Sequence, residues 1–195
     1  MYEKSVRRCL MRHIVVDIET IGIEPGCVIL EIGAASFIHG QTKDITDTFS
    51  VSIDKELSTR LPARITVETR SWWIKNFPIV YGEVLRDCKK NGLSPKEALE
   101  KFNAWIFDSS KDQDIWFWGN GPEFDMSILG YYYDQVKVVE NPFNFRRVAS
   151  IRSLGALLPG VSLGSGIKNE RPHRSVHDAV YEARVLQRFI NEHIR

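Results

Sequence analysis

Two acidic side chains stand close together near the start of the chain, in the segment Asp17-Ile18-Glu19. The residues from His13 to Ile18 are apolar and β-branched on both sides of the alternation, which predicts a buried central strand. Acids two residues apart on a strand point to the same side of the sheet. Two such carboxylates repel each other unless a cation lies between them, so the pair predicts cation binding. The alternative is a strand end that runs into solvent, where acidic residues are common.

Three more polar residues follow at the ends of predicted elements. Asp125 comes just after a Gly/Pro turn at the start of a helix, where an acid can also simply complement the helix dipole. Asp178 is suited to the same cation, although with Ser175 it also matches a capping box. His173 is predicted in an extended loop, from which its imidazole can fold back toward Asp178. A lone histidine in a loop is otherwise usually a solvated surface residue.

Three segments around these residues resemble the three exonuclease motifs of the DEDDh 3′→5′ exonucleases. The segments are Val16-Asp17-Ile18-Glu19-Thr20, Trp118-Gly119-Asn120-Gly121-Pro122-Glu123-Phe124-Asp125 and His173-Arg174-Ser175-Val176-His177-Asp178-Ala179. Residues 29–34 are similar to the second strand of that family, and the resemblance spans residues 14–190. Within the superfamily, Thr66-Val67, Trp72-Trp73 and the Trp-Gly-Asn-Gly turn are most similar to one group. It is the phage and bacterial group related to exodeoxyribonuclease VIII and the mycobacterial-type exoribonuclease.

The resemblance implies an RNase H-like fold and a metal-dependent 3′→5′ exonuclease that releases nucleoside 5′-monophosphates from DNA or RNA. Four carboxylates at one place are destabilising until divalent cations neutralise them, and oxygen ligands favour Mg²⁺ or Mn²⁺ over zinc. Two ions about 4 Å apart are expected, with Asp17 bridging both. Glu19 and Asp178 then hold the ion that carries the attacking water, and Asp125 supports the other. His173 takes the proton of that water as general base.

A different class of protein is the alternative, namely an RNase H-like module that binds nucleic acid without cleaving it. It is disfavoured because all five DEDDh positions are filled.

Two nearby residues are interpreted as structural. His177 is expected to be exposed or capping, because His173 already satisfies the family spacing, and Glu31 is expected to stand behind the site.

Four residues are expected at or near the last nucleotides of the substrate. By resemblance, Thr20 lies near the terminal sugar and Ile21 acts as an apolar wedge against the last bases. An ordinary loop hydrophobe is the alternative for Ile21. Trp72 and Trp73 lie about 100° apart on a predicted helix, so one can be core while the other stacks on a base. We assign Trp73 to the substrate, with core packing of both tryptophans as the alternative.

Positive charge gathers in one segment, between residues 141 and 175. Its bases are Arg146, Arg147, Arg152, Lys168, Arg171 and Arg174, against the one acid Glu170. Such a segment can guide a phosphate backbone, and we assign Arg171 and Arg174 to substrate binding. A solvated loop is the alternative.

The elements that must position these residues indicate an α/β fold. Three leading antiparallel strands, then parallel strands, form a mixed central sheet flanked by helices. The predicted strands are residues 13–18, 28–37, 47–53 and 114–118, and the predicted helices are 66–77, one beginning at Ser94-Pro95, 123–133, 148–158 and 175–193. Ser94, Pro95 and Glu97 supply an N-cap, a first-turn proline and a capping-box acid. Residues 1–12 are predicted to be a flexible basic tail and residues 13–195 a single exonuclease domain.

Length and composition agree with one domain, since the chain has 195 residues of which 43% are hydrophobic. The net charge of +1 excludes a global polyelectrolyte, so a nucleic-acid partner has to be met by local charge. No apolar run is long enough for a membrane span or a signal peptide. The three cysteines are odd in number and scattered, which indicates a reducing, cytoplasmic location. A homodimer is a further expectation, because isolated domains of the resembled family often pair.

Overall fold

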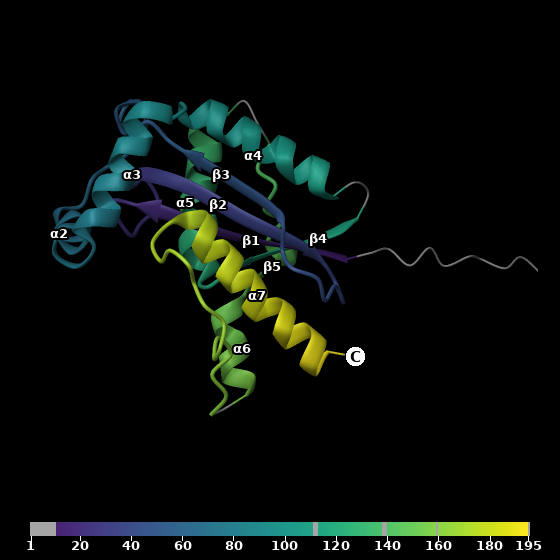
Figure 1. The fold of residues 1–195 in the computed structure, drawn as a ribbon. Helices are drawn as coiled ribbons and strands as arrows, with labels where there is room; N and C mark the ends of the chain where they lie inside the picture. Colours follow the sequence, from purple (N-terminus) through teal and green to yellow (C-terminus); the bar gives the residue numbers. More distant parts are fainter. Residues whose placement is uncertain (1–10, 111–112, 138–139, 159, 195) are drawn as a thin grey trace, which may run out of the picture.

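The computed structural model describes residues 11–110, 113–137, 140–158 and 160–194. Five strands and their connecting helices follow one another in an α/β arrangement (Figure 1). In chain order they are β1 (Met11–Thr20), β2 (Ile29–Ile38), β3 (Asp47–Ser52), α1 (Lys55–Ser58), α2 (Val67–Asn76), α3 (Pro78–Asn91), α4 (Pro95–Ser110), β4 (Asp114–Gly119), α5 (Pro122–Val136), the 3₁₀ helix η1 (Phe145–Arg147), β5 (Val148–Ser150), α6 (Ile151–Leu157) and α7 (Ser175–His193).

The sheet is mixed, as the sequence predicts, and its strand order is β3-β2-β1-β4-β5. The first three strands pair antiparallel, while β4 runs parallel to both β1 and β5. Strand β1 is central because it is apolar on both faces and can be covered by helices on each side. Its last residues, which carry the two acids, therefore lie in the middle of the sheet edge.

Helices cover both faces of the sheet. On one face, Ile14, Val16 and Ile18 of β1 pack with residues of α4 and α5. On the other face, Val15 packs in a separate cluster with α7, which crosses the sheet as the yellow helix of Figure 1. Because side chains alternate along a strand, Asp17 and Glu19 share the face of Val15 and lie on the α7 side.

The start of α7 lies directly against β2. A Cβ atom on Gly33 would be only 2.2 Å from the carbonyl carbon of Ser175 and 2.2 Å from the backbone nitrogen of Val176. Gly33 is the partner of Asp17 in the β1–β2 ladder. The missing side chain at this position therefore lets α7 approach the strand that carries the acids.

Two predicted helices are confirmed closely. Helix α4 starts at Pro95, with a capping box in which the backbone N–H of Ser94 donates to Glu97 at 3.0 Å. Helix α7 covers the predicted residues 175–193.

Three predictions of local structure need correction. Residues 148–158 are not one helix, because Val148 to Ser150 pair with β4 as strand β5 before α6 begins. The helix predicted over residues 66–77 is α2, but Pro78, which follows it, is also the first residue of a second helix, α3, that the sequence did not predict. Met11 and Arg12 belong to β1, where Arg12 donates to Ser36 and pairs with Asp47. The rest of the predicted tail lies outside the described residues.

Within the described ranges, no helix is both long enough and apolar enough to span a lipid bilayer.

Candidate active site

The two acids of β1 lie at the end of the central strand, on the side that α7 covers. Glu19 is buried, and Oδ2 of Asp17 is shielded from solvent with no hydrogen-bond partner among the described residues. Burial, together with repulsion from Glu19 and other acids, raises the pKa of Asp17 well above its usual range. Burial and the charge of Asp178 do the same to the pKa of Glu19. The strand end is therefore buried and not solvated.

Asp125 reaches this place from the first turn of α5. The turn after β4 ends at Pro122, and Gly119 leaves room for Asp125, since a Cβ there would be 3.0 Å from its Oδ2. The backbone N–H of Ile18 donates to Oδ1 of Asp125 at 3.3 Å, which ties the helix to β1. Burial raises the pKa of Asp125 to about 7, against the lowering effect of that hydrogen bond. An acid that only complements the helix dipole is expected to stay in contact with water, which stabilises its charge. Asp125 is instead buried, with 5% of its surface exposed.

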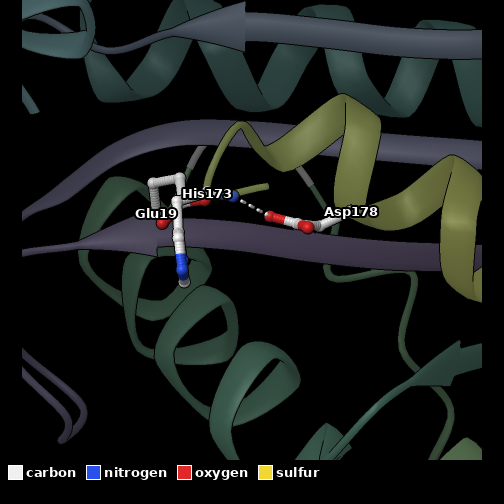
Figure 2. Close-up of side chains that lie close together, drawn as sticks. All are labelled: Glu19, His173 and Asp178. Atoms are coloured by element: carbon white, nitrogen blue, oxygen red, sulfur yellow. Dashed lines mark hydrogen bonds between the residues drawn. The ribbon is translucent and has the colours of Figure 1, made fainter. Parts of the chain in front are cut away.

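His173 and Asp178 reach the site from the start of α7: His173 lies just before the helix and Asp178 in its first turn. The backbone N–H of His173 donates to Oδ2 of Asp178 at 2.8 Å, the dashed line in Figure 2. Asn169 also donates to Asp178, through its side-chain amide. The capping-box alternative fails, because Arg174 is the N-cap and Ser175 is already the first helical residue.

One potential ligand atom from each of Glu19, His173 and Asp178 lies within 4.8 Å of the others (Figure 2). Burial raises the pKa of Asp178 as well. The site thus gathers carboxyl groups whose charged forms are penalised by burial and by each other. An unpartnered buried oxygen and an all-oxygen donor set beside one imidazole fit a divalent cation such as Mg²⁺ or Mn²⁺.

A fifth carboxylate, which the sequence analysis did not single out, lies in the same cluster. Glu182 is on α7, four residues after Asp178, so both side chains project from one side of the helix. It is buried, and its Oε2 has no hydrogen-bond partner among the described residues. The spacing from Asp178 is the signal that could have identified it.

A cavity of about 490 Å³ opens beside Glu19 and His173. Its lining includes Ile18, Glu19, Thr20, Gly22, Ile23, Glu68, Thr69, Trp72, Trp73, Phe124 and His173. Thr20, predicted beside the substrate, is at this wall, and its hydroxyl donates to the carbonyl of Gly22 at 2.6 Å. The cavity is wide enough for a small aromatic ligand next to the carboxylates.

Two of the predicted substrate contacts, Trp73 and Ile21, are almost fully buried in the structure. Trp73 is 2% exposed, and its Nε1 donates to the carbonyl of Thr20 at 2.9 Å, so it supports the wall. Its neighbour Trp72 is 44% exposed and better placed to stack on a base. Ile21 is 1% exposed among Val28 and other core residues, which matches the alternative of an ordinary hydrophobe and leaves no surface for a wedge.

Two bases of the basic segment, Arg171 and Arg174, pair with acids on α3 and β2. Arg174 donates to Glu31 at 2.7 Å and to Asp87 at 2.7 Å, and Arg171 pairs with Glu83 at 2.6 Å. Glu31 is therefore held by Arg174 behind the cluster, in the place predicted for it. Local positive charge at Arg171 and Arg174 is smaller than the sequence alone suggests.

A mixed five-stranded sheet with helices on both faces, and acids gathered at the end of its central strand, defines the class of RNase H-like exonucleases. The chain belongs to the family described as the 3′-5′ exoribonuclease Rv2179c-like domain, whose family model matches residues 12–190. The family match confirms the predicted recognition of a 3′→5′ exonuclease domain.

Solved structures share this fold at low sequence identity. The nuclease domain of 3′hExo, a DEDDh family member bound to rAMP, has a TM-score of 0.68 and 18% identity, with 93% of this chain and 92% of that chain covered. Cell-death related nuclease 4 (CRN-4) has a TM-score of 0.65 and 13% identity, with 93% of this chain and 64% of that chain covered. This chain thus spans less than two thirds of CRN-4.

Pop2p of S. pombe, in a form with bound Mg²⁺ and Mn²⁺, has a TM-score of 0.58 and 13% identity, covering 94% of this chain and 86% of that chain. No match is found among the curated proteins.

Proposed function

We propose that this chain removes nucleotides one at a time from the 3′ end of RNA and releases nucleoside 5′-monophosphates. The observation that carries the proposal is the meeting of Asp17, Glu19, Asp125, Asp178 and His173 beside a cavity, in a member of a 3′-5′ exoribonuclease family. The family description supports RNA over DNA as the substrate.

Asp17, Glu19, Asp125 and Asp178 would hold two divalent cations, Mg²⁺ or Mn²⁺. When bound, such cations stabilise the charge on the attacking and leaving oxygens of a phosphodiester displacement. Asp17 would be central to this set, because its Oδ2 is shielded and unpartnered and the charges of both Glu19 and Asp125 raise its pKa. The Mg²⁺ and Mn²⁺ bound to Pop2p support this choice of ions.

His173 accepts the proton of the attacking water. Its imidazole is held by aromatic neighbours, with ring centroids 3.9 Å from Phe77 and 5.5 Å from Trp72. Its backbone has a positive φ of 64° and is tied to Asp178. This anchoring keeps the ring beside Glu19 and Asp178, where it would meet a water held by those acids and a cation.

The cavity takes the terminal nucleoside. Thr20 lies beside the sugar and Trp72 presents its exposed face to the base. Base stacking on an aromatic side chain contributes about 1–3 kcal/mol and tolerates any base, as an enzyme that shortens a chain stepwise requires.

Incubation with a 5′-labelled single-stranded RNA and its DNA counterpart, each with Mg²⁺ or Mn²⁺ and with or without chelator, tests the proposal. We expect stepwise shortening of the RNA, free 5′-monophosphates as product and loss of both with chelator. Equal or faster shortening of DNA would overturn the choice of RNA. Binding without any shortening would favour the non-cleaving module instead.

A further inference from the structure

The most unusual feature outside the five motif residues is the buried carboxylate of Glu182. Its side chain lies beneath α7, and its Oε2 is shielded from solvent without a hydrogen-bond partner in the described part of the chain. An isolated buried carboxylate costs several kcal/mol unless a proton or a cation neutralises it. Either a proton or a bound cation must therefore neutralise this group, whose pKa is raised by burial and lowered only in part by a backbone hydrogen bond from Asn120.

The position of Glu182 indicates a cation. It follows Asp178 by one helical turn on the side of α7 that faces the sheet. Asp17, whose Oδ2 is likewise shielded and unpartnered, lies on the sheet below that helix. Two unpartnered oxygens thus belong to one cluster of acids, and each of them is repelled by the others. Arg152 lowers the pKa of Glu182 through its charge, but its side chain is exposed and donates no hydrogen bond to Oε2.

We propose that Glu182 is a fifth carboxylate of the metal centre, and that its shielded, unpartnered Oε2 serves a divalent cation held by this cluster of acids. This inference rests on the proposed function, because it assigns a further residue to the same site. In this arrangement Asp178 and Glu182, one turn apart, serve the centre from α7, while β1 supplies Asp17 and Glu19. The helix then contributes two acids instead of one.

Glu182→Gln tests the inference, because it keeps the shape of the side chain and removes its charge. Mn²⁺ affinity is measured by titration followed through electron paramagnetic resonance, and stability by thermal unfolding with and without Mn²⁺. We expect Mn²⁺ to bind about tenfold to a hundredfold more weakly. The metal-free variant should melt at a higher temperature than the native chain, since a buried charge is gone, while the gain on adding Mn²⁺ should shrink.

Glu192→Gln is the matched control, since Glu192 is an exposed glutamate on the same helix. It should leave affinity and both melting temperatures unchanged. A second variant, Glu182→Ala, repeats the measurement if the glutamine variant does not fold. Mn²⁺ affinity equal to that of the native chain in Glu182→Gln would overturn the inference and identify Glu182 as a neutral core acid.

The outcomes separate this inference from the proposed function. If the native chain binds Mn²⁺ and shortens RNA while Glu182→Gln binds Mn²⁺ equally well, only the role of Glu182 fails. If the native chain neither binds Mn²⁺ nor shortens RNA, the proposed function fails and Glu182 loses its role with it.

Discussion

Replacing Gly33 with alanine should push α7 away from the sheet and separate the two halves of the site. The added Cβ would lie 2.2 Å from backbone atoms of Ser175 and Val176, where ordinary contact begins at 3.4 Å. The helix or the strand must therefore move by the difference, about 1.2 Å. Because Gly33 pairs with Asp17 and Ser175 opens the helix of Asp178, this movement falls between the two carboxylates.

Both stability and activity should respond to this change. Overpacking of this kind costs about 1–3 kcal/mol, and a displacement near 1 Å can lower a catalytic rate about a hundredfold. Thermal unfolding should show a melting temperature lower by about 2–12 °C, and kcat/KM on labelled RNA should fall about a hundredfold.

Gly155→Ala is the control, because a Cβ at that position in α6 meets nothing within 4 Å. It should be neutral or stabilising by up to about 1 kcal/mol. The reasoning is refuted if Gly33→Ala and Gly155→Ala give the same melting temperature and the same kcat/KM.

Three other predictions follow from the geometry. In metal-free protein the acids with raised pKa favour folding while protonated, so stability should fall as pH rises from about 4 through 7. Asp125 alone contributes of the order of 4 kcal/mol to this fall, and added Mg²⁺ should flatten the pH profile in thermal unfolding. Trp72→Ala should raise KM for RNA about 5- to 150-fold with little loss of stability. Trp73→Phe should instead lower the unfolding free energy by about 1–3 kcal/mol, because the Thr20 carbonyl loses its hydrogen-bond donor. An equal rise in KM for Trp72→Ala and Trp73→Phe would contradict the assignment of Trp72 as the stacking residue. Raising salt should weaken RNA binding, and Arg171→Ala with Arg174→Ala should flatten that dependence. The same pair should also destabilise the fold by about 3 kcal/mol by leaving Glu31 unpaired, and an unchanged salt slope would exclude these arginines as substrate contacts.

The sequence was sufficient for elements with local signals. The capping box at Ser94 and the apolar alternation of β1 depend only on neighbouring residues, and both appear as predicted. The motif spacing also placed Asp17, Asp125, Asp178 and His173 in one cluster, because strand ends and helix starts meet at one edge of such a sheet.

Features that depend on distant partners were not predictable in this way. Which of Trp72 and Trp73 is buried depends on how α2 is rotated against α3, a helix that the sequence analysis missed. The partners of Arg174 come from β2 and α3, so its charge looked free in the sequence. Glu182 was not identified from the sequence, although it follows Asp178 by one helical turn, because its burial depends on how α7 packs on the sheet.

Mononucleotide release from uniformly labelled RNA by the native chain and by Asp17→Asn tests the central claim most directly. Asp44→Asn serves as the control, because Asp44 is an exposed acid away from the site. The native chain and Asp44→Asn should release 5′-monophosphates with Mg²⁺ or Mn²⁺ and stop when chelator is added, while Asp17→Asn should release none. Release that survives Asp17→Asn, or that is indifferent to chelator, would contradict a metal-dependent exonuclease built on these carboxylates.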